Sequence, residues 1–213
     1  MKKFYGRETE LSRLEEILRQ SREDYSRFTV IVGRRRIGKT YLVTHLIREH
    51  ADDIPAVYLF VGKKTEGTLL TTFKQEVRNK LGEFVPDGIT SFRELFELLL
   101  NIAKRRHFIL FIDEFQEYDN INPEVFSDMQ ELWDRYRHET NMCLIVTGSI
   151  YRTIEKIFKT KSQPLFGRDD MMLKMQPFST DVIRQIMLDN KPDYTNEDLL
   201  ALWTITGGVA KYI

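Results

Sequence analysis

The sequence predicts an α/β fold, a three-layer sandwich in which helices cover both faces of a mainly parallel sheet. Two stretches support this prediction. Residues 29–32, Thr-Val-Ile-Val, form a short β-branched run typical of a buried strand, and residues 33–40 then read Gly-Arg-Arg-Arg-Ile-Gly-Lys-Thr. Residues 108–114, Phe-Ile-Leu-Phe-Ile-Asp-Glu, are a second apolar run and end in two carboxylates. Strands that are apolar on both faces are typical of parallel sheets buried between helices.

Composition narrows the class of protein further. The 213 residues are enough for one α/β core, and Lys+Arg and Asp+Glu both total 32. A net charge of zero argues against a generally basic nucleic-acid platform, although a local patch remains compatible with it. Cys143 is the single cysteine, so we expect neither a disulfide framework nor a zinc site, which fits a reducing cytoplasm. The apolar segments are short and interrupted by charge, so we expect no membrane span.

The remaining elements are expected in chain order around these two stretches. Thr9 is the expected N-cap of an amphipathic first helix, and Ser91 with Glu94 reads as a capping box. The expected strands are residues 27–32, 55–61, 108–112, 142–146 and 171–175. The expected helices lie at about residues 9–18, 39–50, 67–81, 91–105, 123–136 and 151–158. Residues 1–178 are thus the predicted core, and residues 179–213 the predicted start of a small helical module that continues beyond Ile213.

The stretch 33–40 has the spacing G-x-x-x-x-G-K-T of a phosphate-binding loop. Gly33 and Gly38 permit backbone conformations that let amide groups curl around phosphate oxygens, and the following helix adds its positive dipole end. Lys39 is predicted to reach the β- and γ-phosphates, and the Thr40 hydroxyl to ligate Mg²⁺. The three arginines at the variable positions have two interpretations: a solvated basic edge, or a residue that grips a phosphate or a nucleic acid.

Asp113 and Glu114 end a strand at the edge where an open parallel sheet binds ligands. Asp113 is therefore predicted to hold Mg²⁺, directly or through water, and Glu114 to orient and deprotonate an attacking water. The alternative is a strand that ends in a solvated acidic turn.

Thr147-Gly148-Ser149 follows the fourth expected strand and reaches the same edge. Thr147 or Ser149 is placed to sense the γ-phosphate or the attacking water, or to cap the next helix. The four histidines share no metal-ligand spacing, so we expect them to be structural or solvated.

Several stretches together resemble a known family, the archaeal-type ATPases of the STAND group, which are P-loop NTPases related to AAA+ proteins and also found in bacteria. The phosphate loop and the Asp-Glu strand end are common to many NTPases. The stretches that point to this family are the Gly-Arg-Glu entry in Phe4-Tyr5-Gly6-Arg7-Glu8 and Leu165-Phe166-Gly167-Arg168. Thr206-Gly207-Gly208 also matches, and its alternative interpretation is a helix C-cap. The family usually has proline after its Gly-Gly-x, where this chain has Ala210, so the match is weaker there.

The resemblance implies a five-stranded sheet of order 5-1-4-3-2, ATP or ADP as ligand, and an adenine near Tyr5-Gly6-Arg7. It suggests Arg168 as an arginine facing the γ-phosphate, in its own chain or in a neighbour's. Because Gly167 and the fifth strand flank Arg168, we expect it near the ligand edge; the alternative is a surface arginine paired with Asp169 or Asp170. The resemblance also implies a winged-helix domain and often a nuclease-like domain after the ATPase, through which DNA could be contacted.

These observations give a predicted site and a predicted function. The predicted catalytic residues are Glu114, Lys39 and Arg168, and the predicted metal ligands are Thr40 and Asp113. The predicted nucleotide-binding residues are Tyr5, Gly6, Arg7, Gly33, Arg34, Arg35, Arg36, Ile37, Gly38, Lys39, Thr40, Tyr41 and Thr147. We expect an Mg²⁺-dependent ATPase that acts as a nucleotide-driven switch in a larger protein, with homo-oligomers as an open possibility. The alternatives are an ATP-loaded scaffold with negligible turnover and a small-molecule P-loop kinase, which would need an acceptor pocket that nothing here marks.

Overall fold

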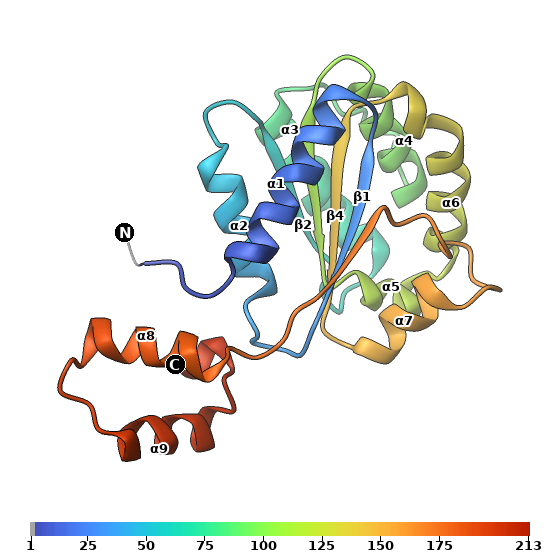
Figure 1. Ribbon diagram of the computed structural model, residues 1–213. Helices are drawn as coiled ribbons and strands as arrows, with labels where there is room; N and C mark the ends of the chain where they lie inside the picture. The colour runs from blue at the N-terminus through green and yellow to red at the C-terminus, as the bar shows by residue number, and fades with distance from the viewer. Residues whose placement is uncertain (1–2) are drawn as a thin grey trace.

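The computed structural model describes residues 3–213 and contains one parallel sheet in the order β2-β3-β4-β1-β5 (Figure 1). Its strands are β1 Arg27–Val32, β2 Ala56–Phe60, β3 Phe108–Asp113, β4 Met142–Gly148 and β5 Met171–Lys174. All four strand pairings are parallel. The predicted fold class and the predicted order 5-1-4-3-2 are therefore confirmed.

Helices cover both faces of the sheet, as predicted. They are α1 Glu8–Glu23, α2 Lys39–Glu49, α3 Glu66–Leu81, α4 Phe92–Ala103, α5 Tyr118–Ile121, α6 Glu124–Tyr136, α7 Tyr151–Lys159, α8 Thr180–Asn190 and α9 Asn196–Thr206. Short 3-10 turns lie at Phe115–Glu117, Arg137–Glu139 and Ala210–Tyr212.

Strand β3 shows how the layers form. Its side chains alternate between the two faces, and every residue from Phe108 to Asp113 is buried. Ile109 and Phe111 join a cluster with α1 and α2, whereas Leu110 and Ile112 join a larger cluster with α3, α4, α6 and α7. A strand that packs on both sides must be apolar throughout, which is why this run is so easily read from the sequence.

Helix ends confirm some predicted caps and contradict others. The capping box of Ser91 and Glu94 is present at α4. Thr9 does not cap α1, because the helix begins one residue earlier, at Glu8, and the Glu8 carboxylate accepts a hydrogen bond from the Gly6 amide at 3.1 Å. A carboxylate in the first turn also interacts favourably with the positive end of the helix dipole.

Helices α8 and α9 pack against each other beyond the end of the sheet from which the phosphate loop emerges (Figure 1). The N-terminal segment connects to them, because Lys3 and the Tyr5 hydroxyl both donate to the Asp189 carboxylate, at 2.6 and 2.9 Å. The Phe178 amide also donates to the Gly208 carbonyl at 2.8 Å. Residues from both ends of the chain are thus brought next to the phosphate loop.

No helix within residues 3–213 has the length and apolar character needed to cross a membrane.

The opposite edge of the sheet carries a half-buried histidine whose titration should affect stability. His107 Nε2 lies 2.9 Å from the Ser21 hydroxyl, which itself donates to the Leu18 carbonyl, so His107 is the donor. Burial, helped by the nearby Arg22 charge, lowers the pKa of His107 to about 4. Because this value lies below that of the unfolded chain, about 6.5, His107 stabilises the fold above pH 6.5, and that stability is lost as pH falls towards 4.

We therefore expect the parent to lose about 1–2 kcal/mol more unfolding free energy than His107→Gln between pH 7.5 and 5.0. Urea unfolding at the two pH values measures this difference. Exposed His138→Gln is the control and should behave like the parent. Equal acid losses in parent and His107→Gln would contradict a depressed pKa at His107.

Candidate active site

The phosphate loop joins β1 to α2 and has the backbone that the glycines were expected to provide. Gly38 adopts φ 102° and is the residue that precedes the first turn of α2. A Cβ there would be strained by this conformation, although the nearest atom it would meet is the Ala210 Cβ at 3.8 Å. Arg36 also has a positive φ, 68°, although it carries a side chain. Such conformations are held only where the surroundings stabilise them.

The Lys39 ammonium group lies inside this loop. It donates to the Gly33 carbonyl at 2.9 Å and to the Arg34 carbonyl at 3.2 Å, and only 5% of the residue is exposed. Burial lowers the pKa of Lys39, while the Glu114 and Asp113 carboxylates act in the opposite direction. A buried cation held by neutral carbonyls is poised to exchange them for a polyanion, to which it binds more strongly.

The Asp113 carboxylate receives four hydrogen bonds from this chain. Its Oδ2 accepts from the Thr40 hydroxyl at 2.8 Å and from the Tyr58 hydroxyl at 3.1 Å. Its Oδ1 accepts from the Glu114 amide at 3.0 Å and from the Thr147 hydroxyl. A carboxylate has about four lone-pair sites, so these donors leave none free for a metal without displacement of one of them. Burial raises the pKa of the Tyr58 phenol, and the Asp113 carboxylate raises it further. The phenol therefore keeps its proton and acts as a donor.

Thr40 and Asp113 together form a donor set that fits a magnesium ion. Mg²⁺ usually keeps several waters and takes one or two protein ligands together with phosphate oxygens. The Thr40 hydroxyl gives its one hydrogen to Asp113 and retains its lone pairs. Within residues 3–213, no three histidines, cysteines, aspartates or glutamates gather to hold a metal. One hydroxyl beside one carboxylate is the donor set expected for magnesium that arrives with a nucleotide.

Glu114 lies beside Asp113 in a left-handed backbone conformation, φ 56°. Its Oε2 accepts from Gln116 Nε2 at 2.6 Å and from the Ser149 hydroxyl at 2.7 Å. Both Glu114 and the adjacent Arg35 contribute to the wall of a cavity, and Arg35 Nε donates to Ser149 at 3.4 Å. Glu114 therefore faces the space above the phosphate loop with its orientation fixed by two neighbours.

Two hydroxyls at the end of β4, from Thr147 within the strand and Ser149 just after it, bind carboxylates. Thr147 is fully buried and donates to Asp113, and Ser149 donates to Glu114. Thr147 therefore contacts the Asp113 carboxylate and does not line the cavity, contrary to its predicted role as a nucleotide-binding residue. Neither hydroxyl caps α7, whose N-cap is Ile150.

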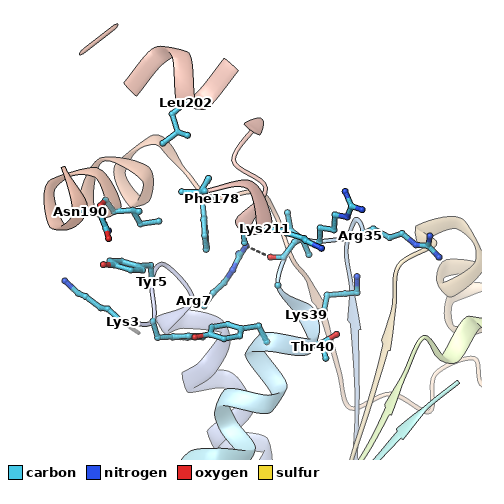
Figure 2. Close-up of a pocket in the computed structure, with 18 of the residues that line it drawn as sticks. Lys3, Tyr5, Arg7, Arg35, Lys39, Thr40, Phe178, Asn190, Leu202 and Lys211 are labelled. Carbon is cyan, nitrogen blue, oxygen red and sulfur yellow. Dashed lines mark hydrogen bonds between the residues drawn. The ribbon is translucent and has the colours of Figure 1, made fainter. Parts of the chain in front are cut away.

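The cavity beside the phosphate loop has a volume of about 1040 Å³ (Figure 2). Besides Glu114, three segments form its walls. They are residues 35–41 of the phosphate loop and α2, the N-terminal residues Lys3, Phe4, Tyr5 and Arg7, and a C-terminal group that includes Phe178, Asn190, Leu202 and Lys211. The part between Tyr5 and α8 is mainly apolar, whereas the part above the loop is basic. This division suits a flat apolar group linked to a polyanion.

Two of the three predicted N-terminal residues lie in the cavity wall. Tyr5 and Arg7 are wall residues, whereas Gly6 has φ 61° and packs against Val182 of α8. The buried Arg7 guanidinium donates to the Ile37 carbonyl at 3.3 Å and to the Gln176 carbonyl at 2.7 Å. Arg7 therefore ties the phosphate loop to the segment that leads into α8.

The three loop arginines have separate positions. Arg34 is exposed, and Arg35 lines the cavity and reaches Ser149. Arg36 also contributes to the cavity wall, and its side chain extends towards the C-terminal segment, where its guanidinium lies 5.4 Å from the Tyr212 ring centroid and donates to the Tyr212 hydroxyl. Of the three, Arg35 is the one that reaches Ser149, whose hydroxyl donates to Glu114.

The predicted place of Arg168 at the ligand edge is wrong. Arg168 precedes the N-terminal end of β5, whereas the phosphate loop follows the C-terminal end of the parallel strand β1. The four paired residues of β5 alone advance about 10 Å between these edges. The Arg168 guanidinium instead pairs with Asp134 of α6 at 3.0 Å, not with Asp169 or Asp170. Within one chain it cannot face a phosphate held by Lys39.

Two residues that hold the carboxylates were not expected from the sequence. Tyr58 lies in an otherwise apolar strand, and Gln116 follows the Asp-Glu pair. A tyrosine among β-strand residues is common, so the sequence carries no signal for the Tyr58 contact. The Gln116 contact depends on the short 3-10 turn that begins at Phe115.

With the geometry established, comparison with known proteins identifies the family. Residues 4–213 match an ATPase domain found predominantly in Archaea. The chain belongs to this family. An uncharacterized protein of Methanocaldococcus jannaschii is 32% identical over 213 residues, which are 99% of this chain and 43% of that protein. The chain thus spans less than half the length of this curated relative.

Solved structures share the fold at lower identity. A Walker-type ATPase of Pyrococcus abyssi superposes with TM-score 0.70 and 20% identity, over 97% of this chain and 65% of that one. The ORC1 protein of Aeropyrum pernix in complex with DNA gives TM-score 0.69 and 16% identity, over 100% and 58% of the two chains. A STAND protein with a tetratricopeptide repeat sensor from Pyrococcus horikoshii gives TM-score 0.55 and 17% identity, over 99% and 29%. The resemblance to archaeal-type P-loop ATPases is thereby confirmed.

Replacing the buried lysine tests the phosphate loop. Lys39→Ala removes a charge-assisted contact worth about 1.5–3 kcal/mol, so MgATP binding should weaken about tenfold or more. Isothermal titration calorimetry measures the affinity, with exposed Lys80→Ala on α3 as the control. Unchanged affinity in Lys39→Ala would refute the assignment of this loop.

Arg168→Ala tests whether Arg168 lies at the edge of the sheet opposite the phosphate loop. Because charges separated by more than about 8–10 Å are largely screened at physiological salt, dilute Arg168→Ala should bind MgATP within about twofold of the parent. A larger loss would contradict the placement. Activity that rises with protein concentration, and partial recovery on mixing Arg168→Ala with Lys39→Ala, would indicate that Arg168 serves a second copy.

Proposed function

We propose that this domain binds ATP with Mg²⁺, hydrolyses it, and acts as a nucleotide-driven switch within a larger multidomain protein. The observation that carries the proposal is the convergence of Lys39, Thr40 and Glu114 on the polar end of one cavity, with Asp113 bonded directly to Thr40. Family membership supports an ATPase domain. The hydrolytic step, the metal and the switch are the parts proposed here.

Separate residues of this chain have separate proposed roles in binding the nucleotide and the metal. Lys39 would exchange its loop carbonyls for the β- and γ-phosphates, and Thr40 would hold the metal. Bound Mg²⁺ neutralises charge on the phosphate oxygens. Asp113, whose lone pairs are all occupied, would hold the metal through a water molecule.

Glu114 is the proposed general base. Its Oε2 accepts both side-chain hydrogen bonds recorded for its carboxylate within residues 3–213, so Oε1 is available to accept the proton of a water. That water attacks the γ-phosphoryl group and ADP departs. A small-molecule kinase would need an acceptor pocket in this place, and the position of Glu114 favours water.

The apolar part of the cavity is the proposed site of the adenine base. Tyr5, Phe178, Ile186, Met187 and Leu202 contribute to its wall, and Asn190 stands at the end of it (Figure 2). Aromatic and aliphatic walls with few polar groups are typical of base-binding pockets.

The switch proposal rests on the two parts of the chain that contribute residues to the cavity walls. We treat residues 1–178 as the core and residues 179–213 as the start of a helical module, and the nucleotide lies between them. The Lys211 amide donates to the Arg36 carbonyl at 3.3 Å, and Tyr212 binds the Arg36 side chain. A ligand that alters the conformation of the phosphate loop would therefore also shift the helical module of residues 179–213.

Larger relatives suggest what the switch could control. One structural neighbour is an ORC1 protein in complex with DNA. Since this chain has no net charge, we propose that any DNA contact is made by domains outside it. A second copy of the chain is the other proposed partner, reached through the Arg168 edge.

Glu114→Gln separates hydrolysis from binding. The amide oxygen can still accept from Gln116 and Ser149, but the group no longer accepts a proton. We expect ATP hydrolysis to slow about 10²–10⁴-fold with MgATP affinity retained. Phosphate release and calorimetry measure the two quantities.

Glu124→Gln, in the first turn of α6, is the control and should match the parent. If Glu114→Gln hydrolyses ATP at the parental rate, Glu114 is not the base. Bound nucleotide without turnover in the parent would favour the scaffold, and phosphate transfer to a small acceptor would favour the kinase.

A further inference from the structure

The Tyr58 hydroxyl contacts Asp113 at the end of β3, although Tyr58 lies in β2 and the phosphate loop follows β1. Tyr58 lies in β2, the edge strand, opposite Phe111 of β3. Asp113 lies two residues beyond Phe111 and therefore on the same face of the sheet, within diagonal reach of a long aromatic side chain. The Tyr58 ring packs on Phe111 with centroids 5.0 Å apart, and its hydroxyl lies 3.1 Å from Asp113 Oδ2.

We propose that Tyr58 is a positioning residue for magnesium: its hydroxyl holds Asp113 Oδ2 so that this carboxylate acts through metal-bound water. The inference rests on the proposed function and extends it to a residue outside the phosphate loop and the Asp-Glu pair. It concerns how tightly the metal binds once the nucleotide is in place.

The other three donors to Asp113 cannot replace Tyr58. The Glu114 amide and the Thr147 hydroxyl both bind Oδ1, the other oxygen. Thr40 shares Oδ2 with Tyr58, but Thr40 is also the proposed metal ligand, so its geometry depends on the metal. Tyr58 is therefore the donor that fixes Oδ2 independently of the nucleotide.

The neighbouring position on the same strand face shows that a hydroxyl is not required for the strand itself. Phe60, two residues on, is paired in register with Asp113 and is 52% exposed. An aromatic ring without a polar group is thus accepted on this face of β2. The Tyr58 hydroxyl is the part of the residue that contacts Asp113, and it can be removed without loss of the ring.

The test compares Tyr58→Phe with Tyr136→Phe. The Tyr136 hydroxyl donates to Glu97 Oε1, also at 3.1 Å, between α6 and α4 on the helical layer. Both substitutions remove one phenol–carboxylate hydrogen bond, but only the first removes it at the site. Calorimetry would measure ATP binding in EDTA and then the Mg²⁺ concentration that gives half of the metal-dependent gain in affinity.

In Tyr58→Phe we expect metal-free ATP affinity and the melting temperature without ligand to stay close to the parent, while half-saturation shifts to about three- to tenfold higher Mg²⁺, as for loss of one hydrogen bond. Tyr136→Phe should leave both ATP measurements unchanged. Parental Mg²⁺ dependence in Tyr58→Phe, or an equal shift in Tyr136→Phe, would overturn the inference and leave the proposed function standing. A parent that binds ATP with no metal dependence would overturn both.

Discussion

The hydrogen bond between Thr40 and Asp113 is the contact on which the site depends. It joins two segments 73 residues apart in sequence. It can form because β4 lies between β1 and β3, so that the loop after β1 and the carboxylate at the end of β3 meet across one intervening strand. Thr147, which comes from that intervening strand, completes the contact by binding the other oxygen of Asp113. The strand order is thus a condition of the chemistry as well as of the packing.

The sequence was most informative where one residue type has one physical purpose. Glycines of the phosphate loop, the lysine that follows them and a strand buried on both faces each leave a pattern, and the structure has them where they were expected. Tyr58 and Gln116 left no pattern, because an ordinary strand residue and an ordinary turn residue acquire their roles only from the pairing of β2 with β3 and from the 3-10 turn after Glu114.

Arg168 shows why a motif can be read correctly and placed wrongly. Three successive charged residues lie before β5, and each is held by a different element. Arg168 pairs with Asp134 of α6, Asp169 with Lys159 of α7, and Asp170 with Arg137. The direction of β5, which the short strand does not reveal by itself, puts this group at the edge remote from the phosphate loop.

The position of β1 also has a consequence for the order in which the protein folds during synthesis. Its neighbours in the sheet are β4 and β5, and Thr29 pairs with Ile145 on one side and with Met171 on the other. The strand that carries the phosphate loop therefore leaves the ribosome well before either neighbour exists. Pairings so distant in sequence are slow to form and leave apolar strands exposed meanwhile. The nascent chain must keep β1 from aggregating until residues 142–174 have emerged, and a nucleotide can stabilise only the chain that has reached that length.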